Sequence, residues 1–174
     1  LNATRIKTPK RTTPFAISHR IFEVTQLDLP QNSLQDYLTL VPGLYAQNTQ
    51  NFAQDLRVSI RGFGARSGFG IRGIKLIVDG IPETTPDGQG QLDNLPLGLI
   101  QSLTVLRGPA SSFYGNASGG VIQLNTLEDF KDNFVRLRLQ SGSYSSKNLA
   151  VTVGWKKNKT KVVLYQNLTE SNGY

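Results

Sequence analysis

One stretch of the chain, residues 103–126, constrains the fold more than any other. Its first residues, 103–106, are apolar or β-branched, which is typical of a mostly buried strand. Gly108 and Pro109 end that strand, because proline lacks a backbone N–H and fixes its own φ, although it is suited to the first turn of a helix. Residues 110–114 then have room for one helical turn before a second extended run begins.

Glycines after that helical turn shape the connection to the second extended run. Gly115 allows the chain to leave the turn through a left-handed φ. Gly119 and Gly120 allow the backbone to bend before residues 121–124 resume an extended path. The stretch therefore predicts a compact corner made of a strand, one helical turn and a second strand.

Two earlier segments have the pattern of strands that end at glycines. In residues 57–61, polar and apolar side chains alternate with the period of a half-buried strand, and Gly62 follows. Residues 74–78 form an apolar run that enters a tight turn at Gly80, just before Pro82.

The glycine-rich run after Gly62 invites comparison with dinucleotide-binding loops. In those loops the glycines open a helix whose N-terminus binds the pyrophosphate, and an acidic residue, here Asp79, binds the ribose. In this chain a strand, residues 74–78, follows the glycines instead of a helix, and there is no G-K-[ST] phosphate loop. The sequence therefore argues against a nucleotide site.

Taken in order, these segments resemble the plug domain of TonB-dependent outer-membrane receptors. The matching segments are S-I-R-G at 59–62, I-V-D-G-I-P at 77–82, V-L-R-G-P at 105–109, Y-G at 114–115 and G-G-V-I at 119–122. The resemblance covers residues 3–126 and departs at Gln101 and Thr104, where the family has acidic residues. The family's structural turns map to Gly62, Gly80, Pro82, Gly108, Pro109, Gly115, Gly119 and Gly120.

The N-terminal part of the chain predicts one strand and one helix. Residues 15–24 alternate loosely as a strand does, and the lone His19 within them is more typical of a strand residue than of a metal ligand. Residues 32–33 with Asp36 form a variant of the capping box, and the apolar side chains of residues 34–41 share one helical face.

Residues 82–94 form a polar loop whose spacing does not match a calcium-binding loop, so we expect a solvated turn. A second helix is predicted to begin at Asn94, because Pro96 suits its first turn. Its apolar face would consist of Leu97, Ile100 and Leu103.

The sequence changes in character after Thr126. A polar linker precedes two segments in which apolar and polar residues alternate, at 135–140 and 148–155, and a third, less regular segment at 162–168. Such segments suit either the first strands of a transmembrane barrel or a soluble antiparallel sheet, and the resemblance upstream favours the barrel. Because three strands cannot close a barrel, the chain is expected to be a fragment of a longer protein.

The expected fold class is therefore α+β. A small mixed-sheet plug domain with short helices would be followed by antiparallel β-strands of an incomplete transmembrane β-barrel. The plug would occupy residues 1–128, with an N-terminal lead-in at about 1–14, and the linker and first barrel strands would occupy 129–174.

Composition excludes several functional classes. The net charge is +7, but the basic residues gather near the start of the chain and in one predicted hairpin turn, without a basic helix or an RNA-binding motif, so no nucleic-acid partner is expected. With one histidine and no cysteine, neither a Ser-His-Asp nor a Cys-His set is possible. We therefore expect that the chain is not an enzyme and has neither a cofactor nor a metal site.

The resemblance implies the gate of an active importer in the outer membrane of a Gram-negative cell. The plug would lie inside the barrel lumen with its N-terminus facing the periplasm, and TonB would pull on a box expected just upstream of Leu1. Expected partners are TonB, the protein's own C-terminal barrel, outer-membrane lipid and a ferric siderophore or other iron chelate. Cobalamin, another metal chelate or an oligosaccharide is the alternative cargo. The alternative function is a soluble α+β module that binds a ligand or partner.

The resemblance also implies two sets of site residues. Polar residues on two loops would form a ligand apex, and arginines of the I-R-G and R-G-P segments would form a latch between plug and barrel. Arginine suits an anionic chelate because its fork binds two oxygens at once. The latch maps to Arg61 and Arg107, each of which has the alternative of capping a carbonyl within the plug. The ligand apex maps to Arg66, Ser67, Arg72, Asp87, Gln89 and Gln91.

Overall fold

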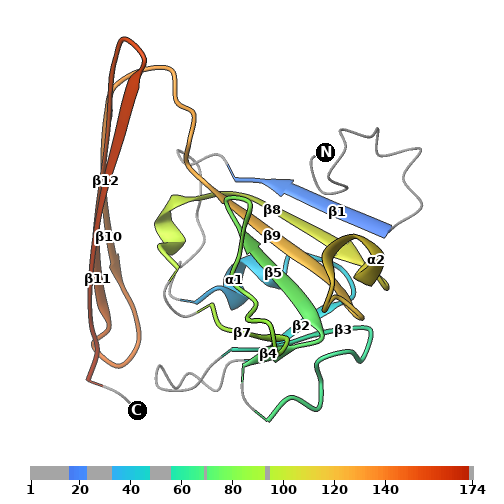
Figure 1. Ribbon diagram of the computed structural model, residues 1–174. Helices are drawn as coiled ribbons and strands as arrows, with labels where there is room; N and C mark the ends of the chain where they lie inside the picture. Colours follow the sequence, from blue (N-terminus) through green and yellow to red (C-terminus); the bar gives the residue numbers. More distant parts are fainter. Residues whose placement is uncertain (1–15, 23–32, 48–55, 69, 93–94, 173–174) are drawn as a thin grey trace. The chain divides into compact units, whose positions relative to one another are not determined.

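The computed structural model describes residues 16–22, 33–47, 56–68, 70–92 and 95–172 (Figure 1). The chain divides into two compact units, Leu1–Thr126 and Leu127–Tyr174. Each unit is described by itself below.

A five-stranded mixed sheet forms the centre of the first unit. Its strand order is β1-β8-β9-β5-β6, and all neighbours pair antiparallel except β5 and β9, which are parallel. The strands are β1 (Ala16–Ile21), β5 (Ile74–Val78), β6 (Ile81–Pro82), β8 (Ile100–Arg107) and β9 (Gly120–Thr126). The mixed sheet confirms the predicted fold class.

Smaller elements surround this sheet. Over the described residues, two further sheets each contain two short strands, and there are two single-turn α-helices and one 3-10 turn. The strand pairs are β2 (Leu44–Gln47) with β3 (Arg57–Ile60), and β4 (Ile71–Arg72) with β7 (Gln89–Gly90). The helical elements are α1 (Gln35–Leu38), η2 (Leu97–Leu99) and α2 (Ser111–Tyr114).

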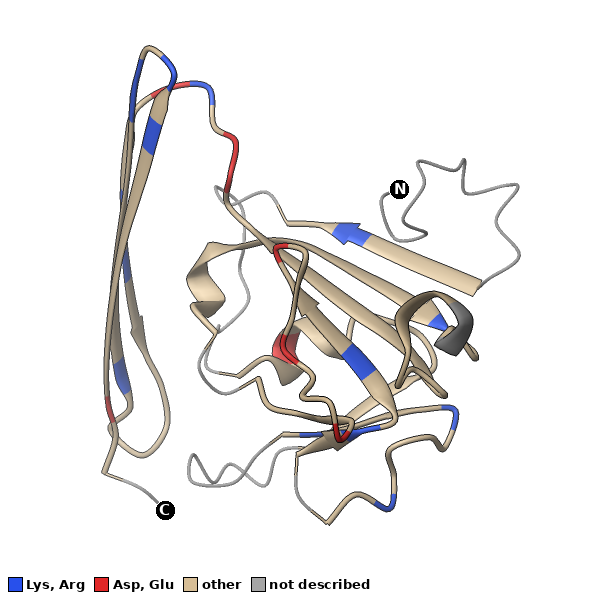
Figure 2. Ribbon diagram, in the orientation of Figure 1, with Lys and Arg blue, Asp and Glu red and all other residues tan. Residues whose placement is uncertain are grey.

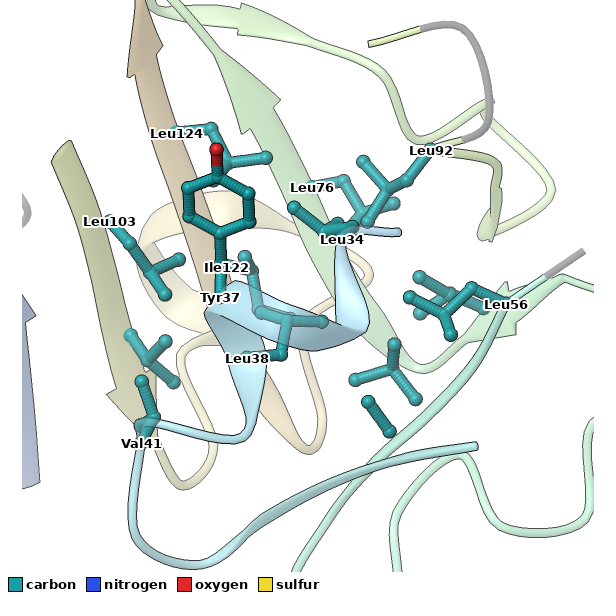
Figure 3. Close-up of a cluster of buried hydrophobic side chains, with 14 of the residues drawn as sticks. Leu34, Tyr37, Leu38, Val41, Leu56, Leu76, Leu92, Leu103, Ile122 and Leu124 are labelled. Atoms are coloured by element: carbon teal, nitrogen blue, oxygen red, sulfur yellow. The ribbon is translucent and has the colours of Figure 1, made fainter. Parts of the chain in front are cut away.

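Helix α1 buries its apolar face against the central sheet (Figure 3). The predicted capping arrangement is confirmed, because the Gln35 N–H donates to Ser33 Oγ at 3.2 Å and the Ser33 N–H donates to Asp36 Oδ2 at 3.3 Å. The predicted cap residue Asn32 lies outside the described residues. Four side chains on this face are almost completely buried, as predicted: Leu34, Tyr37, Leu38 and Val41.

The other face of the sheet carries a second, smaller apolar cluster. Leu106 and Val121 belong to it, whereas their neighbours Val105 and Ile122 belong to the first cluster, because successive strand residues point to opposite faces. Ala110 and Ala117, on either side of α2, complete the second cluster with Ile17 and Ile77. The central sheet is therefore buried on both faces.

The predicted helix cap Asn94 lies outside the described residues, and the prediction that a helix continues through Ile100 and Leu103 is wrong. Only the 3-10 turn Leu97–Leu99 forms, and Ile100 already begins β8. Ile100 and Leu103 are buried as strand residues, because β8 pairs along its length with β9 and with β1. Strand pairing over eight residues outweighs a helical spacing of three apolar side chains.

The second unit is a three-stranded antiparallel sheet of β10 (Phe134–Ser141), β11 (Lys147–Lys157) and β12 (Thr160–Glu170). Alternation along β10 exposes its apolar side chains, since Val135 is 74% and Leu139 is 72% exposed. The opposite face buries the small or polar side chains of Asn148, Ala150 and Thr152. The strands confirm the predicted alternation.

Candidate functional site

The corner between β8 and β9 is held by backbone hydrogen bonds. The N–H groups of Gly108 and Ala110 donate to the carbonyls of Gly119, at 3.1 Å, and Ala117, at 3.0 Å. Gly120 has φ +143°, and a Cβ added there would lie 2.2 Å from the Leu106 carbonyl oxygen. Only glycine fits this position without moving the backbone.

A second turn joins β5 to β6 at the opposite end of the parallel pair. Asp79 and Gly80 have φ angles of +49° and +83°, the signature of a type I′ hairpin turn. The two carboxylate oxygens of Asp79 accept hydrogen bonds from the backbone N–H and the hydroxyl of Thr126, each at 2.7 Å. Thr126 is the last residue of both β9 and the first unit.

The Asp79–Thr126 contact was not foreseen from the sequence, which offered Asp79 only as a rejected ribose ligand. The two residues are 47 positions apart, so no local pattern signals their contact. A polar residue after each of two parallel apolar runs is the one signal that would have found it.

Part of the expected ligand apex is brought together by the β4–β7 pair. Arg72 lies directly opposite Gln89 in this two-residue ladder. Asp87 lies in the turn before β7, where its carboxylate accepts hydrogen bonds from the Thr85 hydroxyl and from the Gln89 N–H. The bond from Thr85 and then that from Gln89 hold the pKa of Asp87 below its usual value of 3.8, and the nearby charge of Arg72 adds to this effect.

The residues of the expected ligand apex do not line one common hollow. Arg72 and Asp87 line a hollow of about 310 Å³, together with Gly88 and residues 115–118. Gln89 and Gln91 line another, of about 440 Å³, with Glu83, Thr85, Leu92 and Leu95. Neither hollow includes Arg66 or Ser67 among its described lining residues, so the structure does not bring these two into the same site.

The two arginines of the expected latch have different surroundings. Arg61 follows β3 in a turn with φ +50° and is exposed. Arg107 is partly buried at the end of β8, and its guanidinium donates to the Pro42 carbonyl at 2.6 Å and to Ser18 Oγ at 2.9 Å. Its buried Nε has no hydrogen-bond partner among the described residues. The alternative of capping a carbonyl within the plug therefore describes the contacts of Arg107 in this chain.

His19 and Thr104 face each other across β1 and β8, with His19 Nδ1 at 2.7 Å from Thr104 Oγ1. Thr104 is one of the two positions at which this chain lacks the acidic residue expected from the resemblance. Over the described residues, no group of three or more His, Cys, Asp or Glu side chains is arranged to hold a metal ion. No helix in the described ranges is long and apolar enough to cross a membrane.

Comparison with known proteins assigns the arrangement to a family. The model of the TonB-dependent receptor plug domain matches residues 9–121. The vitamin B12 transporter BtuB of Vibrio vulnificus (strain CMCP6) is 29% identical over 139 residues, which cover 78% of this chain but 21% of that transporter.

Solved structures show the same fold. The pyoverdine receptor FpvA of Pseudomonas aeruginosa PAO1 matches 95% of this chain and 24% of its own, with a TM-score of 0.69 and 19% identity. The ferric yersiniabactin receptor FyuA of Yersinia pestis matches 87% of this chain and 24% of its own, with a TM-score of 0.60 and 22% identity. The family is one of transport receptors and not of enzymes, and the chain belongs to the plug-domain family of TonB-dependent receptors.

Proposed function

We propose that the chain is the gate of an outer-membrane transporter that imports a ferric siderophore or another iron chelate. The plug fills the lumen of a barrel, residues facing outward bind the cargo, and TonB opens a path by pulling on a segment upstream of Leu1. The observation that supports this most directly is the match of the plug-domain model over residues 9–121.

The second unit supports the membrane part of the proposal. We assign residues 1–128 to the plug and 129–174 to a linker and the first barrel strands, and we propose that the plug's N-terminus faces the periplasm. Strands of 8 to 11 residues with an apolar and exposed face have the length and alternation of transmembrane barrel strands. The opposite face carries Asn148 and Thr152, which suit a polar lumen.

An exposed arginine, Arg72, at the hollow that it shares with Asp87 supports a cargo that carries anionic groups. The guanidinium of Arg72 is exposed, and a chelate with free carboxylate or phenolate oxygens would offer it two acceptors at once. Cobalamin is the second candidate, and one observation favours it: the 29% identity with a vitamin B12 transporter extends over 139 residues.

Ligand binding to the purified full-length receptor tests this function. We expect ferric citrate, a ferric catecholate or a ferric hydroxamate to quench its intrinsic fluorescence saturably, and cyanocobalamin to do so only weakly. The double variant Arg66→Ala/Gln89→Ala should weaken binding of the preferred chelate, whereas Arg20→Ala on the exposed part of β1 should not. Binding of cyanocobalamin alone would replace the iron chelate as cargo, and unchanged affinity in the double variant would remove both residues from the apex.

The plug latch is tested separately. The double variant Arg61→Ala/Arg107→Ala should loosen the plug in the full-length receptor, because removal of one partner from a buried pair costs roughly 3–5 kcal/mol, whereas an exposed pair contributes about 0–1 kcal/mol. Faster hydrogen exchange of plug amides or raised conductance in planar bilayers would support the latch. Wild-type behaviour in both measurements would leave Arg107 with its contacts to Pro42 and Ser18 alone.

A further inference from the structure

The apolar face of the three-stranded sheet has ends of different chemistry. By alternation along β11, this face carries Leu149, Val151, Val153 and Trp155. The cross-strand partners of these residues include Val135, Leu137 and Leu139 on β10 and Leu164 and Leu168 on β12, all five of which are exposed. The apolar band therefore extends across the three strands, interrupted on β12 by Gln166, the partner of Val151.

Two lysines without an acidic partner in the described part of the chain mark one end of the band. Lys157 follows Trp155 on the same face, and its partner across the β11–β12 pair is the uncharged Thr160. The turn between them consists of Asn158, with φ +55°, and Lys159. Neither Lys157 nor Lys159 has an acidic partner among the described residues, whereas Lys161 on the opposite face pairs with Asp129.

The other end of the band is neutral. Lys147 lies on the same face of β11, but its cross-strand partner is Glu170. The turn before it, residues 142–146, contains glycine, serine and tyrosine and no charge. Figure 2 shows basic residues gathered at the turn between β11 and β12, with acidic residues of the linker before β10 near that end, and an uncharged turn between β10 and β11.

We infer that the end formed by Trp155, Lys157 and Lys159 is a docking surface for the phosphate groups of glycerophospholipids. An aromatic ring at the edge of an apolar band lies at the level of lipid headgroups, and lysine stems extend along apolar surface while their ammonium groups reach toward phosphate. Two neighbouring ammonium groups on a tight turn can donate hydrogen bonds to the two non-bridging oxygens of one phosphodiester. The inference rests on the proposed function, in which these strands span the outer membrane.

Two matched variants on the same face of β11 test the inference. The full-length receptor is placed in bilayers of phosphatidylcholine with added phosphatidylglycerol and lipid A, and the lipids retained after extraction are counted by native mass spectrometry. Each lysine near an anionic surface contributes a factor of about fivefold in affinity. We therefore expect Lys157→Gln to reduce phosphatidylglycerol retention about fivefold, Lys159→Gln to add a similar factor, and Lys147→Gln to change nothing.

Three outcomes overturn the inference. Equal losses in Lys157→Gln and Lys147→Gln would show that position on the sheet does not matter. Retention that is unchanged by 0.5 M NaCl would exclude a charge-based contact at this exposed end. A loss of lipid A retention, with phosphatidylglycerol unaffected, would assign the surface to a different lipid.

Protease protection of β10–β12 in the same bilayers distinguishes a failure of the proposed membrane placement from a failure of the docking surface. A receptor whose strands remain open to protease would refute the membrane placement in the proposed function. Protected strands without a preference for phosphatidylglycerol would refute the docking surface alone.

Discussion

The same alternation of apolar and polar residues buries apolar side chains in the first unit and exposes them in the second. In the first unit alternation buries apolar side chains, so that Leu103 and Ile122 are completely covered. In the second unit it exposes them, so that Leu137 is 63% exposed while Thr152 on the other face is 3% exposed. Alternation therefore determines which residues share a face, and the surroundings of each face determine whether it carries leucine or threonine.

The largest expected difference between the two units comes from truncating one leucine in each. In aqueous solution Leu103→Ala should lower the free energy of unfolding of the first unit by about 2–5 kcal/mol, because it leaves a cavity in a buried core. Leu137→Ala should change the stability of the second unit by no more than about 0.5 kcal/mol, because its side chain is exposed. Hydrogen exchange of β9 and β11 amides reports the two units separately, and equal losses would contradict the comparison.

Glycine substitution probes the tightest contacts of each unit. Gly120→Ala should cost roughly 1–3 kcal/mol from its positive φ alone, with the clash against the Leu106 carbonyl in addition. In Gly154→Ala the new Cβ would meet the Phe134 ring at 2.2 Å, and a ring can rotate away, so we expect a cost of about 1 kcal/mol.

Gly68→Ala is the control for both, because nothing lies within 4 Å of the position that its new methyl group would take and its φ is not in the left-handed region. Chemical denaturation of the three variants should rank Gly120→Ala well below the other two in stability. A Gly154→Ala variant as unstable as Gly120→Ala would show that the aromatic contact is as rigid as the backbone contact.

The boundary between the units is probed by Asp79→Asn. The neutral amide retains one acceptor oxygen and loses the charge, so the contact with Thr126 should weaken by about 1 kcal/mol. Hydrogen exchange at the Thr126 amide should then accelerate about fivefold, since 1.4 kcal/mol corresponds to a factor of ten. Asp132→Asn in the linker is the matched control, and acceleration in both variants would attribute the effect to net charge.

The smallest expected effect is a difference in pH response between two exposed carboxylates. The hydrogen bond and then the charge of Lys161 hold the pKa of Asp129 below 3.8, while hydrogen bonds from Thr85 and Gln89 dominate for Asp87. Each contribution to stability is present above pH 3.8 and is lost as the pH falls through the lowered folded pKa.

Carboxyl carbon NMR titrations should therefore give both midpoints below 3.8. Thr85→Ala should raise the midpoint of Asp87, and Lys161→Gln should raise that of Asp129. In 0.5 M NaCl only Asp129 should move noticeably, because salt screens its Coulombic part. A salt response of equal size at Asp87 would show that charge, and not hydrogen bonding, dominates there.

Most of the local structure was predictable because glycine and proline mark its turns. The end of β8 at Arg107, the helical turn at Ser111–Tyr114 and the hairpin at Asp79 follow from residues that permit few backbone conformations. The capping contacts of Ser33 and Asp36 were also local and predictable.

The features that escaped prediction are non-local. The two-residue pair of β4 and β7 is too short to leave a periodic pattern, although it places Arg72 opposite Gln89. Ile100 seemed helical by spacing, because its strand partner Thr126 lies far away in the sequence. The contacts of Arg107 with Pro42 and Ser18 depend on the same long-range packing.

The pairing pattern of the sheets also has a kinetic consequence. Ile17 pairs with Leu106 and Ile74 with Gly120, so the central sheet closes only after long loops have been ordered. In the second unit Ser141 pairs with Lys147 and Lys157 with Thr160, contacts of low contact order that form in microseconds. We therefore expect the two hairpins of the second unit to pair sooner than the central sheet, whose pairs close longer loops.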